Sequence, residues 1–343
     1  MSDQLRLAML GAKHGHARTK TRWLRDTPDI DLVGIYEPSL EFRADRETTP
    51  EYQHITWIDD IDDVLGDASI DGIVIGGAEV ENPSYARRSL AAGKHVLMEK
   101  ACGWTKAHAD ELIGTAQQKG LLFQVGYNFR PLPPFRRVID MVRAGDFGTV
   151  HLVRAHMGSP FSADVLPRQL GGPYFRGGAF YNLGCHALDM VMAVAGTPDA
   201  VHPFRRQVRS ESQAQDYYDL NIVVLEYPKT LASIELSFLE TENRRPRSFE
   251  VYGSEAQAIV TPFMIAGDRV PSAAIHTGGP GAGADGWHIH GADPFEPFRA
   301  DIDEFAACIR GEKEPWIDYA HDLAVQHTLM DICGESDVEE LHS

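Results

Sequence analysis

The chain has 343 residues, of which 43% are hydrophobic and 24% charged, and its formal net charge is −18 at pH 7. That length and composition predict a soluble protein of two domains, while the negative charge, spread without a basic block, argues against nucleic acid and membrane surfaces as partners. No apolar run suits a signal peptide or a membrane span, so we expect a cytoplasmic protein.

The first predicted element is an apolar strand, 5–10, which ends at Gly11 and precedes a helix-forming stretch, 17–25. Strand, glycine turn and helix open a dinucleotide-binding unit, in which amides at a helix N-terminus approach a pyrophosphate. The turn, Gly-Ala-Lys-His-Gly-His, departs from G-x-G-x-x-G because Lys13 replaces the second glycine and Gly15 comes one place early. We assign cofactor binding to the turn residues Gly11, Lys13, His14, Gly15 and His16.

Glu37 follows the second predicted strand, 31–36, and lies 26 residues after Gly11. A carboxylate at this place can accept both hydroxyls of an adenosine ribose and repels a 2′-phosphate, which favours NAD over NADP without excluding NADP. The alternative is that Glu37 is a solvated turn carboxylate before Pro38.

Strands and helices alternate through the rest of the first domain. The predicted strands are 72–75, 96–98 and 121–125, and the predicted helices are 40–46, 84–92 and 106–119. Such alternation predicts a parallel sheet with helices on both faces, in which ligands bind at the carboxyl ends of the strands. The residues just past those ends complete the predicted cofactor site: Gly76, Gly77, Glu99, Lys100 and Asn128.

Beyond Pro131–Pro134 the pattern changes to a helix, 135–143, followed by strands that favour an antiparallel sheet. The predicted strands are 149–156, 219–227, 231–239 and 249–252, and two closing helices are predicted at 294–310 and 318–332. A glycine-rich patch and Trp287–His290 are predicted to form a long loop, because their composition offers no period. An apolar sheet face left uncovered by helices would be a protein–protein surface.

A helix is predicted over 180–195, after the pair Gly177–Gly178. On this helix Asn182, His186 and Asp189 lie at i, i+4 and i+7 and share one face. A buried polar face costs free energy unless it is hydrogen-bonded, so these residues are either satisfied within the fold or kept for chemistry. The residues alone leave both interpretations open.

Two histidine pairs, His14-x-His16 and His288-x-His290, raise the question of a metal site, since paired imidazoles chelate zinc and iron. Neither pair has a nearby carboxylate or cysteine set at the usual ligand spacing, so we predict no metal. The four cysteines lie far apart without a Cys-x-x-Cys spacing, which indicates reduced thiols.

Four segments together resemble the Gfo/Idh/MocA family, the relatives of glucose–fructose oxidoreductase and inositol dehydrogenase. They are the glycine turn, Ala92–Lys100, Gly126–Arg130 and Gly177–Asp189, in that order over most of the chain. The resemblance implies an α/β Rossmann domain over 1–128 and, over 129–343, an α+β domain with a large, mainly antiparallel open sheet. It also implies NAD or NADP at the strand ends, hydride transfer on a sugar or cyclic polyol, and a homodimer or homotetramer.

Carried over residue by residue, the resemblance places Lys100 on the lysine of the family's Glu-Lys-Pro motif, His186 on its catalytic histidine, and Asn182 where an aspartate is common. It implies that Lys100 holds the substrate hydroxyl and stabilises developing negative charge, while His186 accepts the hydroxyl proton. Asn182 can orient the His186 ring but cannot stabilise an imidazolium as a carboxylate does. The predicted partners of substrate hydroxyls are Tyr174, Arg176, Asn128 and Asp189.

Ala101 replaces the family's proline, which commonly follows a cis peptide. A non-proline cis bond costs about 3 kcal/mol, so we expect the loop at Lys100 to differ from the family's. The favoured function is an NAD(P)-dependent sugar or polyol dehydrogenase. Two alternatives stay open: a redox-neutral elimination or hydrolysis of a glycoside that uses bound NAD transiently, and an NAD-binding sensor without hydride transfer, which Lys13, Ala101 and Asn182 favour.

Overall fold

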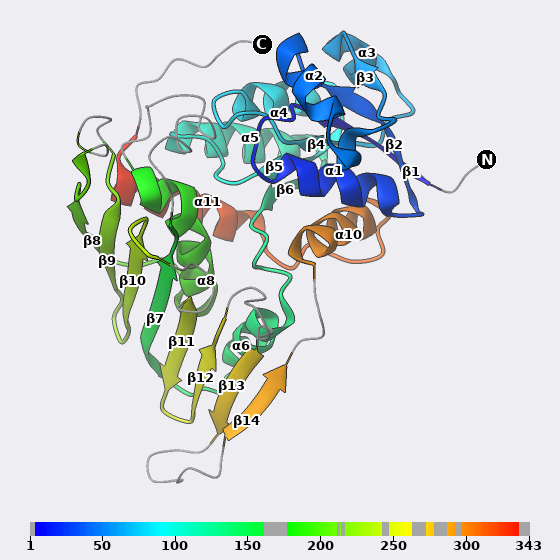
Figure 1. Ribbon diagram of the computed structural model, residues 1–343. Coiled ribbons are helices and arrows are strands. Elements are labelled where there is room, and N and C mark those ends of the chain that lie inside the picture. The colour runs from blue at the N-terminus through cyan, green and yellow to red at the C-terminus, as the bar shows by residue number, and fades with distance from the viewer. Residues whose placement is uncertain are drawn as a thin grey trace.

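Two β-sheets, each packed against helices, make up the computed structural model of the chain (Figure 1). The structure describes residues 4–160, 177–210, 213, 217–241, 247–262, 272–277, 287–291 and 296–335. Within these residues, no helix is both long enough and apolar enough to cross a membrane.

The first sheet has six parallel strands in the order β3-β2-β1-β4-β5-β6. Its elements are β1 (Leu5–Leu10), α1 (Ala17–Asp26), β2 (Ile30–Tyr36), α2 (Leu40–Glu47), β3 (Trp57–Ile58), α3 (Ile61–Gly66), β4 (Gly72–Ile75), α4 (Asn82–Ala91), β5 (His95–Glu99), α5 (Lys106–Lys119) and β6 (Phe123–Gly126). This is the strand order of a doubly wound dinucleotide-binding domain, and the order reverses between β1 and β4. The structure thus confirms the predicted alternation. The short β3 and α3 are not predicted, because segments of so few residues are too short to show a hydrophobic periodicity.

The second sheet has eight strands in the order β14-β13-β12-β11-β7-β10-β9-β8. Every neighbouring pair is antiparallel except β7 with β10, so the predicted, mainly antiparallel sheet is confirmed. Its elements are α6 (Pro133–Ala144), β7 (Val150–Gly158), a π-helical turn (Phe180–Gly184), α8 (Cys185–Ala195), β8 (Ala200–Arg206), β9 (Leu220–Glu226), β10 (Leu231–Ser237), β11 (Ser248–Gly253), β12 (Ala256–Val260), β13 (Ser272–Thr277) and β14 (Trp287–Gly291).

Helices α6 and α8 cover one face of this second sheet. The strands alternate accordingly: in β9, Val223 is fully buried whereas Ile222 is 45% exposed. The strand register places Phe204 and Leu231 on the same open face as Ile222, and both are exposed. An apolar face of this kind suits the predicted contact with a second copy of the chain, which stays a prediction.

The edge strand β14 contradicts the loop predicted for Trp287–His290. It pairs with β13 through the backbone, but most of its side chains are exposed. Burial therefore imposes no alternating pattern on its sequence.

The last two helices return toward the first sheet. Helix α10 (Pro297–Ile309) packs against α1, and its Ile302 and Phe305 join the core formed by one face of the first sheet. Helix α11 (Tyr319–Cys333) contacts both α5 and α8 and so lies between the two sheets (Figure 1). The segment predicted as a second domain, 129–343, thus includes a helix that completes the core of the first.

Candidate active site

The glycine turn closes tightly on the loop after β4, at the point where the strand order reverses. Gly11 has a φ of +75°, and a Cβ placed on it would lie 2.3 Å from the Cα of Gly77. The Gly11 amide donates to the Tyr36 carbonyl (2.7 Å), and the His14 amide donates to the Gly76 carbonyl (2.9 Å). Gly76 and Gly77 therefore pack against the turn and fix its shape.

Replacing Gly11 with alanine is expected to lower the free energy of unfolding by about 3 kcal/mol, because the new Cβ meets backbone atoms and the positive φ strains an L residue. Gly120→Ala is the matched control. Gly120 has a φ of +64°, but nothing lies within 4 Å of its added Cβ, so a loss of about 1 kcal/mol is expected there. Chemical denaturation measures both losses, and equal values would contradict the importance of the contact with Gly77.

The glycine turn also offers an anion two free amides at the N-terminus of α1. Among the described residues, the amides of Lys13 and Gly15 have no hydrogen-bond partner, whereas the Ala12 amide donates to Glu37 Oε2 (3.0 Å). Unpaired amides beside the positive end of a helix dipole favour a phosphate group. The turn therefore fits the pyrophosphate of a dinucleotide, despite its departure from G-x-G-x-x-G.

Glu37 holds this turn to the chain that follows β2. Its Oε2 accepts from Ala12, its Oε1 accepts from the Ser39 amide (3.1 Å), and the Lys13 ammonium lies 3.5 Å from Oε1. Lys13 also bonds to Glu81. Because Glu37 has no exposed surface, the interpretation as a solvated turn carboxylate is wrong. Recognition of the ribose by Glu37 stays a prediction.

Glu99, at the end of β5, brings both histidines of the turn to one carboxylate. Its Oε2 lies 3.0 Å from His16 Nδ1 and 3.7 Å from His14 Nδ1, and one nitrogen or oxygen atom of each residue that could bind a metal lies within 4.8 Å of the others. The premise that no carboxylate accompanies this histidine pair is thus wrong. Yet Lys20 Nζ lies 2.9 Å from the other oxygen of Glu99, and the positive end of the α1 dipole is adjacent. The local charge therefore favours an anion over a metal cation.

Lys100 reaches from the first domain to the second. Its Nζ donates a hydrogen bond to the Asn182 carbonyl (2.6 Å), and both residues are buried. Asn182 lies in the π-helical turn Phe180–Gly184, so the continuous α-helix predicted over 180–195 is wrong in its first turn. Turns widened in this way are frequent at functional sites. The Lys100–Ala101 peptide is cis, contrary to the expectation based on the missing proline.

His186 follows at the start of α8, where its surroundings favour the neutral ring. Burial and then the Lys100 ammonium hold the pKa of His186 well below its usual range, so the ring can accept a proton at neutral pH. The ring packs edge-on against Phe129, 4.9 Å away, and Tyr127, 5.8 Å away, measured between ring centroids. Its Nδ1 is buried without a hydrogen-bond partner. The Asn182 side chain therefore does not orient the ring through this atom, and Asn182 contributes its carbonyl to Lys100 instead.

Asn128 and Glu79 also present buried polar atoms without hydrogen-bond partners. Asn128, just after β6, is 4% exposed, and its Oδ1 has no hydrogen-bond partner. Glu79, in the loop between β4 and α4, is 3% exposed, and neither of its carboxylate oxygens has one. Buried polar atoms left unpaired are costly, so such atoms indicate a place for a ligand. Glu79 is missing from the predicted site because that prediction stops two residues earlier, at Gly77.

Asp189 is committed to the fold, and the structure does not support its predicted contact with substrate. Arg130 donates to both carboxylate oxygens of Asp189, at 2.6 to 3.0 Å, and His321 Nε2 lies 2.9 Å from Oδ1. Arg130 also bonds to Asp322. Burial raises the pKa of the Asp189 carboxyl, but Arg130 and His321 outweigh burial and lower that pKa to about 2. Of the two interpretations of the buried polar face, Asp189 therefore fits the first, in which the side chain is satisfied within the fold.

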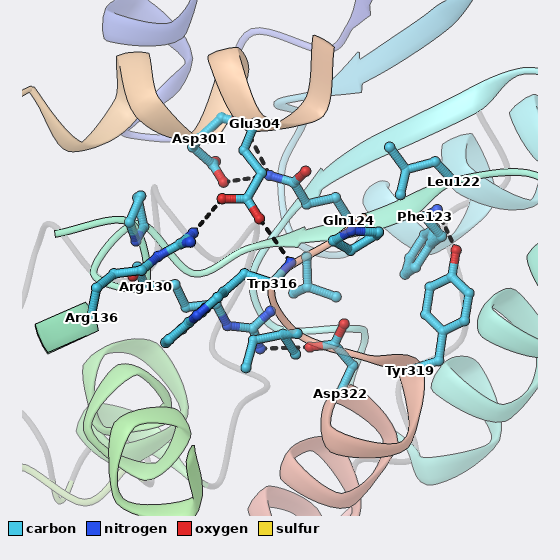
Figure 2. Close-up of a pocket in the computed structure, with 14 residues that line it drawn as sticks. Leu122, Phe123, Gln124, Arg130, Arg136, Asp301, Glu304, Trp316, Tyr319 and Asp322 are labelled. Carbon is cyan, nitrogen blue, oxygen red and sulfur yellow. Dashed lines mark hydrogen bonds and ion pairs between the residues drawn. The ribbon is translucent and has the colours of Figure 1, made fainter. Parts of the chain in front are cut away.

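A recess lies where β6, α6, α10 and α11 meet, and neither Lys100 nor His186 lines it (Figure 2). Glu304 accepts hydrogen bonds there from Arg136 and from the Trp316 amide. Because such side chains bond to one another and to the backbone, we interpret the recess as a structural junction.

Tyr174 and Arg176 lie outside the described residues, so their contact with substrate stays a prediction. The glycine-rich patch, 278–286, also lies outside the described residues, so the loop predicted for it stays a prediction.

Two family models match the chain in succession. A model of the oxidoreductase family with an NAD-binding Rossmann fold, GFO_IDH_MocA, matches residues 5–127, and a model of the GFO/IDH/MocA C-terminal domain matches residues 135–259. The chain belongs to the Gfo/Idh/MocA family. The resemblance drawn from the sequence motifs is thereby confirmed, and the first domain is an NAD-binding Rossmann fold.

Individual Gfo/Idh/MocA proteins are similar to this chain to different extents. The oxidoreductase YhhX of Escherichia coli (strain K12) is 32% identical over 198 residues, which cover 54% of this chain and 56% of YhhX. The scyllo-inositol 2-dehydrogenase (NADP(+)) IolW of Bacillus subtilis (strain 168) is 22% identical over 233 residues, which cover 68% of this chain and 63% of IolW. Among solved structures, the UDP-N-acetylglucosamine 3-dehydrogenase GnnA from Acidithiobacillus ferrooxidans aligns with a TM-score of 0.76 at 20% identity, covering 96% of this chain and 97% of GnnA. That structural likeness shows the fold alone.

Proposed function

We propose that this Gfo/Idh/MocA protein is a dehydrogenase that transfers hydride between a nicotinamide cofactor and a secondary alcohol of a sugar or cyclic polyol. The observation that carries the proposal is the meeting of Lys100, from the first domain, with the turn of the second domain that holds Asn182 and leads into His186. A charged donor beside a neutral imidazole suits the removal of a hydroxyl proton. The name of IolW, which describes an inositol dehydrogenase, supports the same substrate class.

Each residue has a distinct task in this proposal. The amides of Lys13 and Gly15 hold the pyrophosphate, and the bound cofactor supplies the hydride acceptor. The Lys100 ammonium holds the substrate hydroxyl oxygen and stabilises negative charge that develops on it. His186 accepts the hydroxyl proton, and the unpaired Oδ1 of Asn128 accepts a hydrogen bond from a second hydroxyl. The Glu37 carboxylate favours NAD over NADP.

The proposal is tested by incubating the full chain with NAD or NADP and a panel of inositols, aldoses and nucleotide sugars, while following reduced nicotinamide by fluorescence. We expect at least one sugar or polyol to produce it, faster with NAD than with NADP.

Two other results would favour the alternatives. Binding of NAD without reduction by any substrate would favour the NAD-binding sensor. NAD retained through purification, with a glycoside consumed and no net reduced cofactor, would favour redox-neutral elimination or hydrolysis.

A further inference from the structure

Glu79 stands in the site without a role in the reaction as described so far. Its loop is fixed by a neighbour, because the Ala78 amide donates to Glu81 Oε2 (2.9 Å) and the Glu81 amide donates to the Ala78 carbonyl (2.8 Å). The Glu79 carboxylate itself is buried and has no hydrogen-bond partner on either oxygen. Lys100 Nζ lies 3.8 Å and His14 Nε2 lies 3.9 Å from its Oε1.

We propose that Glu79 is a positioning residue of the active site, whose carboxylate holds the Lys100 ammonium and balances the positive charge that forms when His186 takes the hydroxyl proton. This inference rests on the proposed dehydrogenase function. It gives Glu79 an electrostatic task exerted through Lys100, and assigns it no contact with substrate.

The distribution of negative charge in the site favours this role. When His186 accepts a proton, an imidazolium forms near the Lys100 ammonium in a buried site, where like charges repel strongly. Asn182 offers no charge to compensate. The carboxylate of Asp189 is already bound to Arg130.

The carboxylate of Glu99, which is also buried beside the site, already has partners. Glu99 forms an ion pair with Lys20 through one oxygen, at 2.9 Å, and contacts His16 Nδ1 through the other, at 3.0 Å. Among the described acidic residues around Lys100, Glu79 is therefore the one whose charge is not already balanced by a partner other than Lys100.

The ionisation of Glu79 supports the same role. Burial raises the pKa of its carboxyl to about 7, against a smaller opposing effect of Lys100. The groups that face it come from four elements: His14 from the glycine turn, Lys100 and Glu99 from the end of β5, Tyr181 from the π-helical turn, and Cys185 from α8. Burial also holds the pKa of His186 well below its usual range, so ionisation of Glu79 and of His186 occurs in separate pH ranges.

These two properties predict a pH dependence with a definite sign. Above pH 7 Glu79 is a carboxylate, and the Lys100 charge is balanced. As the pH falls through about 7, Glu79 takes up a proton, the Lys100 ammonium loses its counter-charge, and proton uptake by His186 becomes less favourable. Activity should therefore fall on the acid side with an apparent pKa that belongs to Glu79.

The experiment compares the wild type with Glu79→Gln and Glu79→Asp. For Glu79→Gln we expect turnover above pH 8 to fall by about tenfold to a hundredfold, and the decrease near pH 7 to disappear. Glu79→Asp keeps a carboxylate and should keep the acid decrease. Glu111→Gln is the control, because it removes an exposed carboxylate that pairs with Arg87 (2.6 Å). It should change neither the turnover above pH 8 nor the decrease in activity near pH 7.

A second readout needs no substrate. Infrared spectra of the cofactor-free full chain should show the carbonyl stretch of a protonated carboxyl group that disappears as the pH rises through about 7, and Glu79→Gln should lack this band. If the wild type is active and Glu79→Gln keeps both its turnover and the decrease near pH 7, the role of Glu79 is overturned but the dehydrogenase function is not. Identical infrared titrations of the two proteins would have the same meaning. A wild type inactive with every substrate in the panel would overturn the dehydrogenase function, and this role with it.

Discussion

Lys100→Met is expected to lower turnover by about 10²- to 10³-fold while leaving the dissociation constant of NAD nearly unchanged. The ammonium of Lys100 is held by the Asn182 carbonyl at 2.6 Å, at the meeting point of the two domains. Methionine keeps the length of the side chain but removes the charge, so negative charge on the substrate oxygen loses its stabilising donor. We expect NAD affinity to come mainly from the glycine turn, where the amides of Lys13 and Gly15 are proposed to hold the pyrophosphate.

Lys94→Met is the matched control for this variant. Lys94 is also a buried lysine, and it lies just before the amino end of β5 whereas Lys100 lies just after its carboxyl end. Its ammonium donates to the carbonyls of Asp67 and Ile70, at 2.5 and 2.9 Å, so its loss should cost stability and leave turnover per folded molecule unchanged. Steady-state kinetics and NAD titration by fluorescence measure both variants. Equal turnover of Lys100→Met and the wild type would refute the role of Lys100.

The sequence predicts the first sheet well because its strands and helices leave local marks on consecutive residues. Helix α5 has the predicted bounds, Lys106–Lys119, since Thr105 caps the His108 amide and Gly120 ends the helix with a φ of +64°. Elements without such local sequence signals are not predicted. Strand β14 exposes most of its side chains, and the π-helical turn Phe180–Gly184 has the same apolar spacing as the start of an α-helix.

The partners within the site could not be predicted, because they come from segments far apart in the sequence. Asp189 bonds to Arg130 and His321, which lie 59 and 132 residues away. Periodicity shows that Asp189 is on a buried polar face, but it does not show which cation balances the charge. The family motifs identify Lys100 and His186, but the approach of these two residues to one another depends on how the two domains pack.

Arg130→Met is expected to lower the free energy of unfolding by about 3 to 5 kcal/mol, because it leaves two buried carboxylates without their common cation. Arg130 binds Asp189 and Asp322 at once, and all three side chains are buried. The guanidinium also lies over the Tyr127 ring, 4.5 Å from its centroid, and Tyr127 in turn packs against His186. We therefore expect this variant to lose activity as well as stability.

Arg87→Met shows what an exposed pair contributes. Arg87 also makes two hydrogen bonds to one carboxylate, that of Glu111, at 2.6 and 2.8 Å, but solvent screens this pair, so a loss below about 1 kcal/mol is expected. Urea denaturation followed by tryptophan fluorescence measures both variants. Adding Asp189→Leu and Asp322→Leu to Arg130→Met should recover part of the lost stability, because apolar side chains then replace unpaired charges. Without that recovery, the loss would reflect the packing of the arginine and not the charge it leaves behind.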